Sequence, residues 1–359
     1  MKLAFAIEDN VGNTTYRKNL AHFIAQREDV QAEFVPVKLI ADDIWQLLPV
    51  INANYALTAS ARAASSLHAI DKRLGLDAAF IHSQSIALFG LSFMHKVPTV
   101  ISSDATPANF DTLAQGYGHE VRGPGMERFK KHWTRATFKA AAKLLGFSEW
   151  VKDSYVNDYG ADPDKVVVVS SGVDTTLWRP EPAKRAQDGI VRILFIGGDL
   201  KRKGGDVLLR WAAETRHRDF ELHLVTKDPV PEQARVHAHY GMTSNAPELI
   251  ELAQRCEVFA FPTRADCYPF GCIEAAAAGM AGVSFALGAI HEIIVDGTTG
   301  LLAKAGDDAG FCERLDKLVE DASTREAMGR AARERALSKF DAKTNAGRVI
   351  EVMRSISER

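Results

Sequence analysis

Several features are scarce in this chain of 359 residues, and each scarcity argues against a class of protein. The chain has only four cysteines, with no C-x-x-C pair, and no histidine cluster at ligand spacing, so the sequence indicates neither a zinc site nor a disulfide framework. No stretch approaches the roughly 18 uninterrupted apolar residues of a membrane-spanning helix. The first ten residues include one lysine and an apolar run too short for a signal peptide. We therefore expect a cytoplasmic protein with reduced thiols.

Net charge is also nearly absent, because 44 lysines and arginines face 46 aspartates and glutamates. This balance argues against a nucleic acid as partner, since such binders carry a basic excess. What is present is an ordinary globular composition, with 46% hydrophobic and 25% charged residues. At roughly 150 residues per domain, the length predicts two domains with sizeable cores.

Short β-rich runs alternate with longer amphipathic runs along most of the chain, which predicts an α/β fold with parallel sheets. Eleven strands are expected, too many for one compact sheet, at 2–7, 32–37, 78–83, 98–104, 143–148, 165–170, 191–197, 221–226, 236–240, 256–262 and 282–286. A polar, proline-containing stretch near 165–190 predicts the hinge. The expected domains are 1–165 and 166–340. A final helix, 341–359, either caps the second domain or crosses back to the first.

One predicted helix, 128–144, is strongly basic on one side. Its apolar positions, Phe129, Trp133, Ala136, Ala140 and Leu144, fall on another face. A basic amphipathic helix is able to dock on anionic lipid, which makes a peripheral membrane contact one interpretation. The alternative is a helix that packs on the core and exposes its basic side to solvent.

The stretch 258–285 has the clearest chemical pattern. An apolar strand ends at Pro262, a turn contains Asp266, and a helix begins near Pro269. Helix N-termini at the carboxyl ends of parallel strands present free N–H groups to anions, so a diphosphate is expected to face the amides of Tyr268, Phe270 and Gly271. One turn into the helix, Glu274 is able to accept bonds from two adjacent ribose hydroxyls. Alternatively, both acids are ordinary solvated surface groups.

A second candidate segment follows the strand 191–197, where Gly197 and Gly198 lead into a turn with Lys201, Arg202 and Lys203. The spacing matches neither a P-loop nor G-x-G-x-x-G. A cationic turn at a strand's carboxyl end is able to stabilise a leaving diphosphate without a metal ion. A solvated basic turn is the alternative.

The first domain offers weaker candidates at two strand ends. Gly12 allows a ligand to approach the backbone, and Asn13 or Thr14 is positioned to cap the next helix. Ser103 and Asp104 follow the strand PTVI. Each of these also fits an ordinary βα turn.

Together these segments resemble family 4 of the retaining, nucleotide-sugar-dependent glycosyltransferases, which have the GT-B fold of two Rossmann-like domains facing across a cleft. The likeness is strongest from about 144 to 307 and includes the motifs FIGGDLKRKGG and FAFPTRADCYPFGCIEAAAAG. In the first domain it lies mainly in the layout and in the segment around Gly12.

The resemblance implies a role for several residues. The family's pair of acids falls on Asp266, which would contact the donor sugar, and Glu274, which would hold the ribose. Its lysine falls on Lys203. Gly12 would approach the donor phosphate, and the segment Gly288 to Glu292 would line the sugar. No metal or other cofactor is implied; the donor phosphate itself would accept the acceptor's proton.

The chain departs from the family pattern at four places. Asp266 replaces a glutamate and is about 1.5 Å shorter, one carbon–carbon bond. The position that usually holds an arginine is Gly198, for which Arg202 is the candidate substitute. Pro269 removes one N–H. A common histidine after PTVI is replaced by Ser103 and Asp104, which leaves His119 as a distant candidate.

The resulting hypothesis is a retaining glycosyltransferase that moves a sugar, hexose by type, from a nucleotide-diphosphate sugar to a glycan, lipid or small-molecule acceptor, in carbohydrate or cell-envelope glycan synthesis. An epimerase or phosphorylase with the same architecture is an alternative, although no paired acid and base and no pyridoxal lysine are evident. A non-catalytic sugar-nucleotide-binding protein is another. Without G-x-G-x-x-G, a dinucleotide oxidoreductase is disfavoured.

Overall fold

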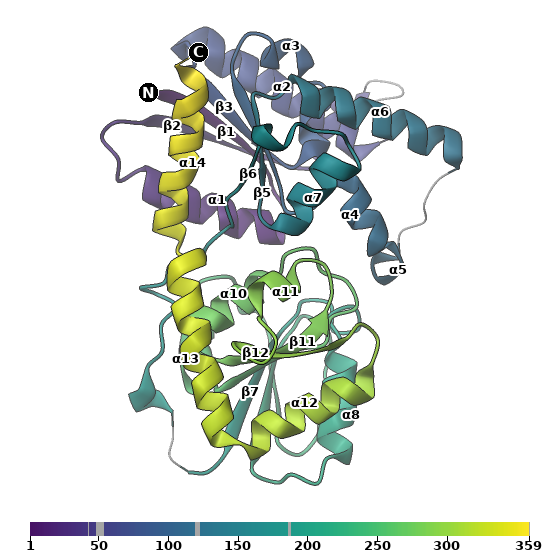
Figure 1. The fold of residues 1–359 in the computed structure, drawn as a ribbon, viewed down its shortest axis with the longest axis vertical. Coiled ribbons are helices and arrows are strands. Elements are labelled where there is room, and N and C mark those ends of the chain that lie inside the picture. Colours follow the sequence, from purple (N-terminus) through teal and green to yellow (C-terminus); the bar gives the residue numbers. More distant parts are fainter. Residues whose placement is uncertain (42, 48–53, 119–122, 186–187, 359) are drawn as a thin grey trace. The chain divides into compact units, whose positions relative to one another are not determined.

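The computed structural model describes residues 1–41, 43–47, 54–118, 123–185 and 188–358. They form two units, each with its own six-stranded parallel sheet (Figure 1). The first unit comprises Met1–Asp111, Glu120–Gly172 and Ala342–Arg359, and the second comprises Thr112–His119 and Val173–Asp341. The predicted α/β class with two Rossmann-like units is confirmed.

The first sheet has the strand order β2-β1-β3-β4-β5-β6. Its strands are β1 (Lys2–Glu8), β2 (Gln31–Val37), β3 (Ala78–His82), β4 (Thr99–Ser103), β5 (Lys143–Gly146) and β6 (Val166–Val168). Its helices are α1 (Val11–Ile24), α2 (Tyr55–Leu74), α3 (Leu91–Met94), α4 (Pro107–Thr112), α6 (Pro124–Ala140), α7 (Glu149–Asn157) and α14 (Ala342–Ser357). Because β6 pairs with β5, residues expected to open the second domain complete the first sheet.

The second sheet has the order β12-β11-β10-β7-β8-β9. Its strands are β7 (Val191–Ile196), β8 (Phe220–Val225), β9 (Val236–His239), β10 (Val258–Phe261), β11 (Ala281–Ala286) and β12 (Gly300–Lys304). Its helices are α5 (Ala114–Tyr117), α8 (Gly205–Glu214), α9 (Pro247–Arg255), α10 (Phe270–Ala277), α11 (Ile290–Ile293), α12 (Asp308–Glu320) and α13 (Ala322–Lys339). The strand β12 was absent from the sequence-based prediction, because GLLAK is short and follows a glycine-rich turn directly.

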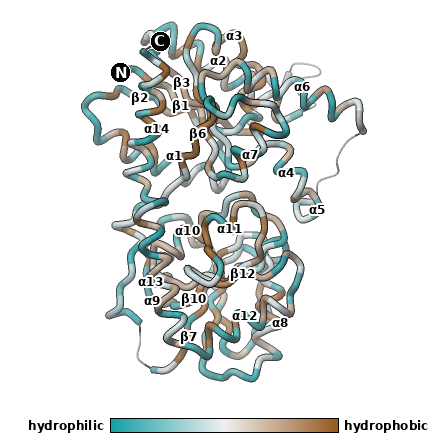
Figure 2. The backbone as a smooth tube through the Cα atoms, viewed as in Figure 1, coloured by the Kyte–Doolittle hydropathy of each residue, from teal (hydrophilic) through white to brown (hydrophobic). Residues whose placement is uncertain are grey.

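Apolar residues concentrate in the strands of both sheets (Figure 2). In β1 all six positions after Lys2 are buried, which is the pattern of a central strand covered on both faces. Helices on the two faces provide that cover through one apolar stripe each.

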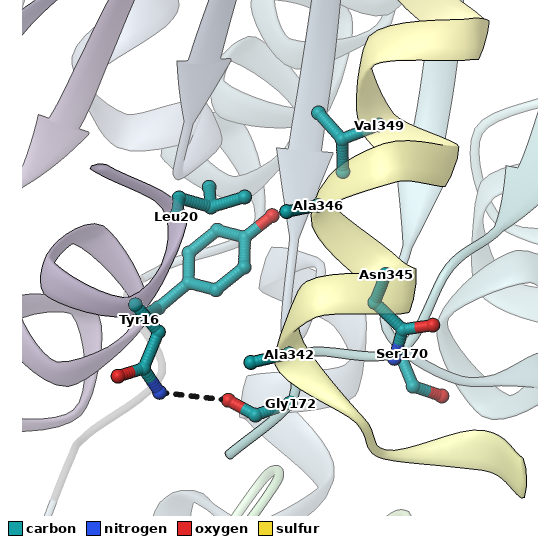
Figure 3. A pocket seen from close by; sticks show the side chains of 9 residues that line it. Tyr16, Leu20, Ser170, Gly172, Ala342, Asn345, Ala346 and Val349 are labelled. Carbon is teal, nitrogen blue, oxygen red and sulfur yellow. Dashed lines mark hydrogen bonds between the residues drawn. The ribbon is translucent and has the colours of Figure 1, made fainter. Parts of the chain in front are cut away.

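The last helix, α14, lies along the first unit beside α1 (Figure 1). The apolar positions expected from its helical spacing, Ala346, Val349, Ile350 and Met353, are all buried. At its start, α14 lines a small pocket with Tyr16 and Leu20 of α1, and Asn19 Nδ2 donates to the carbonyl of Gly172 at 2.9 Å (Figure 3). This bond is buried, and it links Gly172, the last residue of the segment Glu120–Gly172, to α1.

The segment after Gly172 is held by the second unit. Val173 N donates to the carbonyl of Phe340 at 3.0 Å, and Thr175 Oγ1 donates to Asp341 at 2.7 Å. Arg333 of α13 donates to the carbonyls of Thr175 and Trp178. The chain therefore leaves the first unit and returns to it at neighbouring points.

The basic helix begins earlier than expected, as α6 (Pro124–Ala140), and a different face is buried. Thr134, Thr137, Phe138 and Ala141 are buried, whereas Phe129, expected to face the core, is 57% exposed. Phe138 packs edge-on against Tyr155 of α7, which sets the rotation of the helix. No helix among the described residues is both long enough and apolar enough to cross a bilayer.

Candidate active site

The two segments singled out from the sequence meet at the carboxyl edge of the second sheet. The strand β10 pairs directly with β7, so the turn after β7 and the loop after β10 leave the sheet side by side. Gly204 has φ +82° and lies so close to Pro262 that a Cβ would clash with the Pro262 carbonyl oxygen. Arg264 N donates to the carbonyl of Arg202 at 2.8 Å. Close backbone packing thus makes the turn and the loop one surface.

Lys203 and Asp266 face each other across this surface as an ion pair between Nζ and Oδ2. Both side chains are largely buried, with 15% and 13% exposed. A pair at low exposure has little screening by solvent, so each charge holds the other in position. Nζ of Lys203 also lies 5.4 Å from the ring centroid of Phe261. This contact restricts the conformations of the lysine side chain.

The helix α10 begins at Phe270, with Pro269 as the N-cap residue rather than as the first helical residue. The first-turn amides, including those of Phe270 and Gly271, have no carbonyl to bond within the helix. Pro269 offers no N–H and no side-chain cap, which leaves the positive end of the helix uncapped. Tyr268 is buried just before it. These amides remain the candidate anion-binding groups.

Glu274 lies one turn into α10 and is only 5% exposed. Burial raises the pKa of its carboxyl from 4.5 to about 7. Its side chain makes no hydrogen bond to another residue in the part of the chain that the structure describes. A buried carboxyl without a protein partner costs folding free energy, and its oxygens are left available to hydrogen-bond donors from a ligand.

The segment Gly288–Glu292, expected to line the donor sugar, packs its first residues against the loop with Asp266. Gly288 has φ +51°, and a Cβ there would lie 2.8 Å from the Asp266 carbonyl oxygen. Ala289 N donates to the carbonyl of Cys267 at 3.3 Å. Glu292, in α11, is half-buried, and its carbonyl accepts from Arg335. Gly288 and Ala289 therefore lie against the loop with Asp266.

Arg202, the candidate replacement for the missing arginine, is occupied by protein contacts. Its Nη1 donates to the carbonyl of Ala265 at 2.9 Å, and its Nε lies 3.3 Å from Asp199. The guanidinium also stacks over Tyr117 of α5 at 5.1 Å. These contacts brace the loop after β10, and a phosphate would have to compete with them.

In the first unit, Gly12 and Asn13 lie inside α1 rather than in a loop, which corrects the capping expectation. The N-cap is Asn10, whose side chain accepts from Asn13 N at 3.0 Å. Asn13 is buried, and its Oδ1 lies 3.0 Å from His82 Nε2. Burial lowers the pKa of His82 to about 3, so this histidine is neutral and its Nε2–H donates to Asn13. The Asn13 side chain is thus committed to the core.

The carboxyl edge of the first sheet carries Glu8 and Ser83, which the sequence-based prediction did not include, together with Asp104, which it did. Glu8 ends β1 and accepts from Asn10 Nδ2 at 2.7 Å and from Ser85 Oγ at 2.6 Å. Ser83 follows β3 with φ +82° and contacts Ser85. Asp104 follows β4 at the same edge. The sequence does contain a signal for Glu8, because an acidic residue directly after the apolar strand KLAFAI is expected at the carboxyl end of that strand. His119 lies outside the described residues.

Comparison with known proteins gives the family. One family model, Glycosyltransferase Family 4, matches residues 22–177, and another, Glycosyl transferases group 1, matches residues 191–321. The chain belongs to the family 4 glycosyltransferases. The first match lies mostly in the first unit, and the second match lies within the second unit. The second match contains both the turn with Lys203 and the loop with Asp266.

Relatives in sequence are named for different activities. A D-inositol 3-phosphate glycosyltransferase of Arthrobacter sp. is 31% identical over 216 residues, 54% of this chain and 51% of that protein. A glycogen synthase of Mycobacterium tuberculosis is 25% identical over 224 residues, 58% of this chain and 53% of that one. The chain thus spans about half the length of the curated relatives it matches.

Several solved structures share the fold over nearly the whole chain. A sucrose-phosphate synthase from Thermosynechococcus elongatus matches with a TM-score of 0.78 at 15% identity, over 99% of this chain and 98% of that one. HepE of Anabaena in complex with UDP-glucose matches with a TM-score of 0.70 at 16% identity, over 99% and 100%. The GT-B fold is therefore confirmed.

The buried Glu274 leads to a prediction about stability. Its ordinary pKa of 4.5 applies in the unfolded chain and about 7 in the folded protein, so the folded state loses stability as pH rises from about 4.5 through 7. Glu274→Gln should therefore stabilise the ligand-free protein at pH 8, by about 1–3 kcal/mol, with little gain at pH 5. Urea unfolding at both pH values tests this.

The matched control is Glu214→Gln on the exposed part of α8, which should leave the pH dependence unchanged. Equal effects of Glu274→Gln at pH 5 and pH 8 would contradict a raised pKa.

Proposed function

We propose that the protein is a retaining glycosyltransferase that uses a nucleotide-diphosphate sugar as donor. The observation that carries the proposal is the ion pair of Lys203 with Asp266, next to the uncapped start of α10 and the buried Glu274. This set offers a cation and amides for a diphosphate, and carboxylates for sugar hydroxyls. The similar HepE structure contains UDP-glucose, which supports a donor of this class.

In the proposed reaction, the acceptor's hydroxyl oxygen bonds to the anomeric carbon while the bond from that carbon to the donor phosphate breaks. The hydroxyl proton passes to the departing phosphate on the same face, which retains the anomeric configuration. Lys203 and the amides at the start of α10 stabilise the negative charge that develops on the diphosphate, without a metal ion. Asp266 orients the sugar, and Glu274 holds the ribose.

We assign acceptor binding to the first unit, at the carboxyl edge of its sheet. Glu8, Ser83 and Asp104 lie at the carboxyl ends of three neighbouring strands there, and their oxygens suit a hydroxylated acceptor such as a glycan, a lipid headgroup or a small polyol. The strained φ of Ser83 fits a functional strand end.

The first test is a panel of UDP-, GDP- and ADP-sugars, scored by thermal shift and by slow hydrolysis in the absence of acceptor. A transferase should be stabilised by one donor and release its sugar slowly. Stabilisation without any sugar release would favour the alternative, a non-catalytic sugar-nucleotide-binding protein. Interconversion of the donor sugar would favour an epimerase.

The second test is Lys203→Ala, which removes the fixed positive charge next to the leaving group. We expect the rate of donor hydrolysis or transfer to fall about 10²-fold or more, as for the loss of one electrostatic stabiliser. Lys304→Ala, at the end of β12 on the far edge of the same sheet, is the control. A rate within a few-fold of the wild type would remove Lys203 from the mechanism.

We further propose that the start of α6 contacts an anionic membrane surface. Met126 and Phe129 are 47% and 57% exposed, beside the exposed Arg128 and Lys131. Exposed apolar side chains next to basic ones are typical of helices that lie on lipid. The rotation of α6 that takes Phe129 out of the core favours this interpretation over a purely core-facing helix.

Phe129→Asp should reduce co-sedimentation with vesicles that contain anionic lipid, several-fold, because it removes apolar area and adds a repelled charge. Leu337→Asp changes a residue of similar exposure, 48%, on α13 and should leave co-sedimentation unchanged. If both variants sediment like the wild type, α6 is not the contact.

A further inference from the structure

The proposed leaving group needs more positive charge than Lys203 supplies. A nucleoside diphosphate carries at least two negative charges at neutral pH, and Lys203 is already paired with Asp266. The sequence-based candidate for a second cation, Arg202, is held by Asp199, the carbonyl of Ala265 and the ring of Tyr117. A second cation at this edge of the sheet would add to the stabilisation that Lys203 and the amides of α10 offer.

Gly198 is the position from which a side chain would reach this space. A Cβ built on Gly198 meets only one residue within 4 Å, the stem of Lys227, with Cδ and Cε both at 3.8 Å. These are ordinary van der Waals distances, so the site beside Gly198 is open except for Lys227. The Lys227 ammonium, one bond beyond Cε, thus lies close to the point from which a side chain on residue 198 would start.

The backbone holds Lys227 in this place. It lies two residues after the end of β8, which pairs with β7. Gly197 N donates to the carbonyl of Val225 at 2.9 Å, and Leu200 N donates to Asp228 Oδ2 at 2.7 Å. Two hydrogen bonds, one on either side of Lys227, therefore join the end of β8 to the turn after β7.

The ammonium of Lys227 has no competing partner in the described part of the chain. It makes no ion pair and no hydrogen bond there, and the residue is exposed. This distinguishes it from Lys203, which is paired with Asp266, and from Arg202, which is braced on three sides. An unpaired, exposed ammonium binds a phosphate without first breaking a protein contact.

We propose that Lys227 is the second cation that binds the donor's diphosphate, in the space left free by Gly198. The assignment rests on the proposed function and adds a residue from a third segment, after β8, to the turn after β7 and the loop after β10. Arg202 is then a positioning residue that braces the loop with Asp266.

Calorimetry with UDP, GDP and ADP, and with the matching monophosphates, tests the assignment. Lys227→Ala should weaken binding of the preferred diphosphate about ten-fold or more, and binding of its monophosphate less. Adding Gly198→Arg to Lys227→Ala should recover most of the loss, since the new guanidinium enters the space that the lysine vacates. Lys304→Ala is the control for a general loss of positive charge.

The outcomes separate the two hypotheses. Wild-type protein that binds none of the three diphosphates would contradict the proposed function and the role of Lys227 together. Wild-type binding that Lys227→Ala leaves unchanged would overturn only the role of Lys227. An equal loss for diphosphate and monophosphate would also overturn it, because the lysine would then act on another part of the nucleotide.

Discussion

The close approach of two loops, made possible by Gly204, is the constraint on which the candidate site depends. A side chain at 204 would collide with the carbonyl of Pro262, and φ +82° is itself a conformation that favours glycine. With glycine there, the turn after β7 and the loop after β10 pack backbone to backbone. Lys203 then reaches Asp266, which lies more than sixty residues further along the chain.

The same region shows how stability and function oppose each other. Glu274 is buried without a side-chain partner in the described residues, and its pKa is raised by that burial. The residue costs the ligand-free protein free energy near neutral pH. Such a cost is understandable where a ligand supplies hydrogen-bond donors that the protein lacks, and polar groups that are half-satisfied in isolation are typical of binding sites.

The family pattern leads one to expect an arginine just after β7, and in this chain two other residues, Arg202 and Lys227, take different parts of its role. Arg202 braces the loop after β10 through Ala265 and Tyr117. Lys227 occupies the space next to Gly198. Tyr117 comes from a short segment, Thr112–His119, that belongs to the second unit although both neighbouring parts of the chain belong to the first. Residues distant in sequence thus contribute to one loop arrangement.

The sequence by itself determined the α/β class, the two units, nearly all strands and the segments with Lys203, Asp266 and Glu274, because alternating apolar periodicity and strand-end chemistry are local signals. Only the tertiary structure decided the rest. The face of α6 that is buried depends on Phe138 meeting Tyr155, the commitment of Asn13 depends on His82, and the place of Lys227 depends on β8 pairing with β7. Each is a contact between segments distant in the chain, which no local pattern specifies.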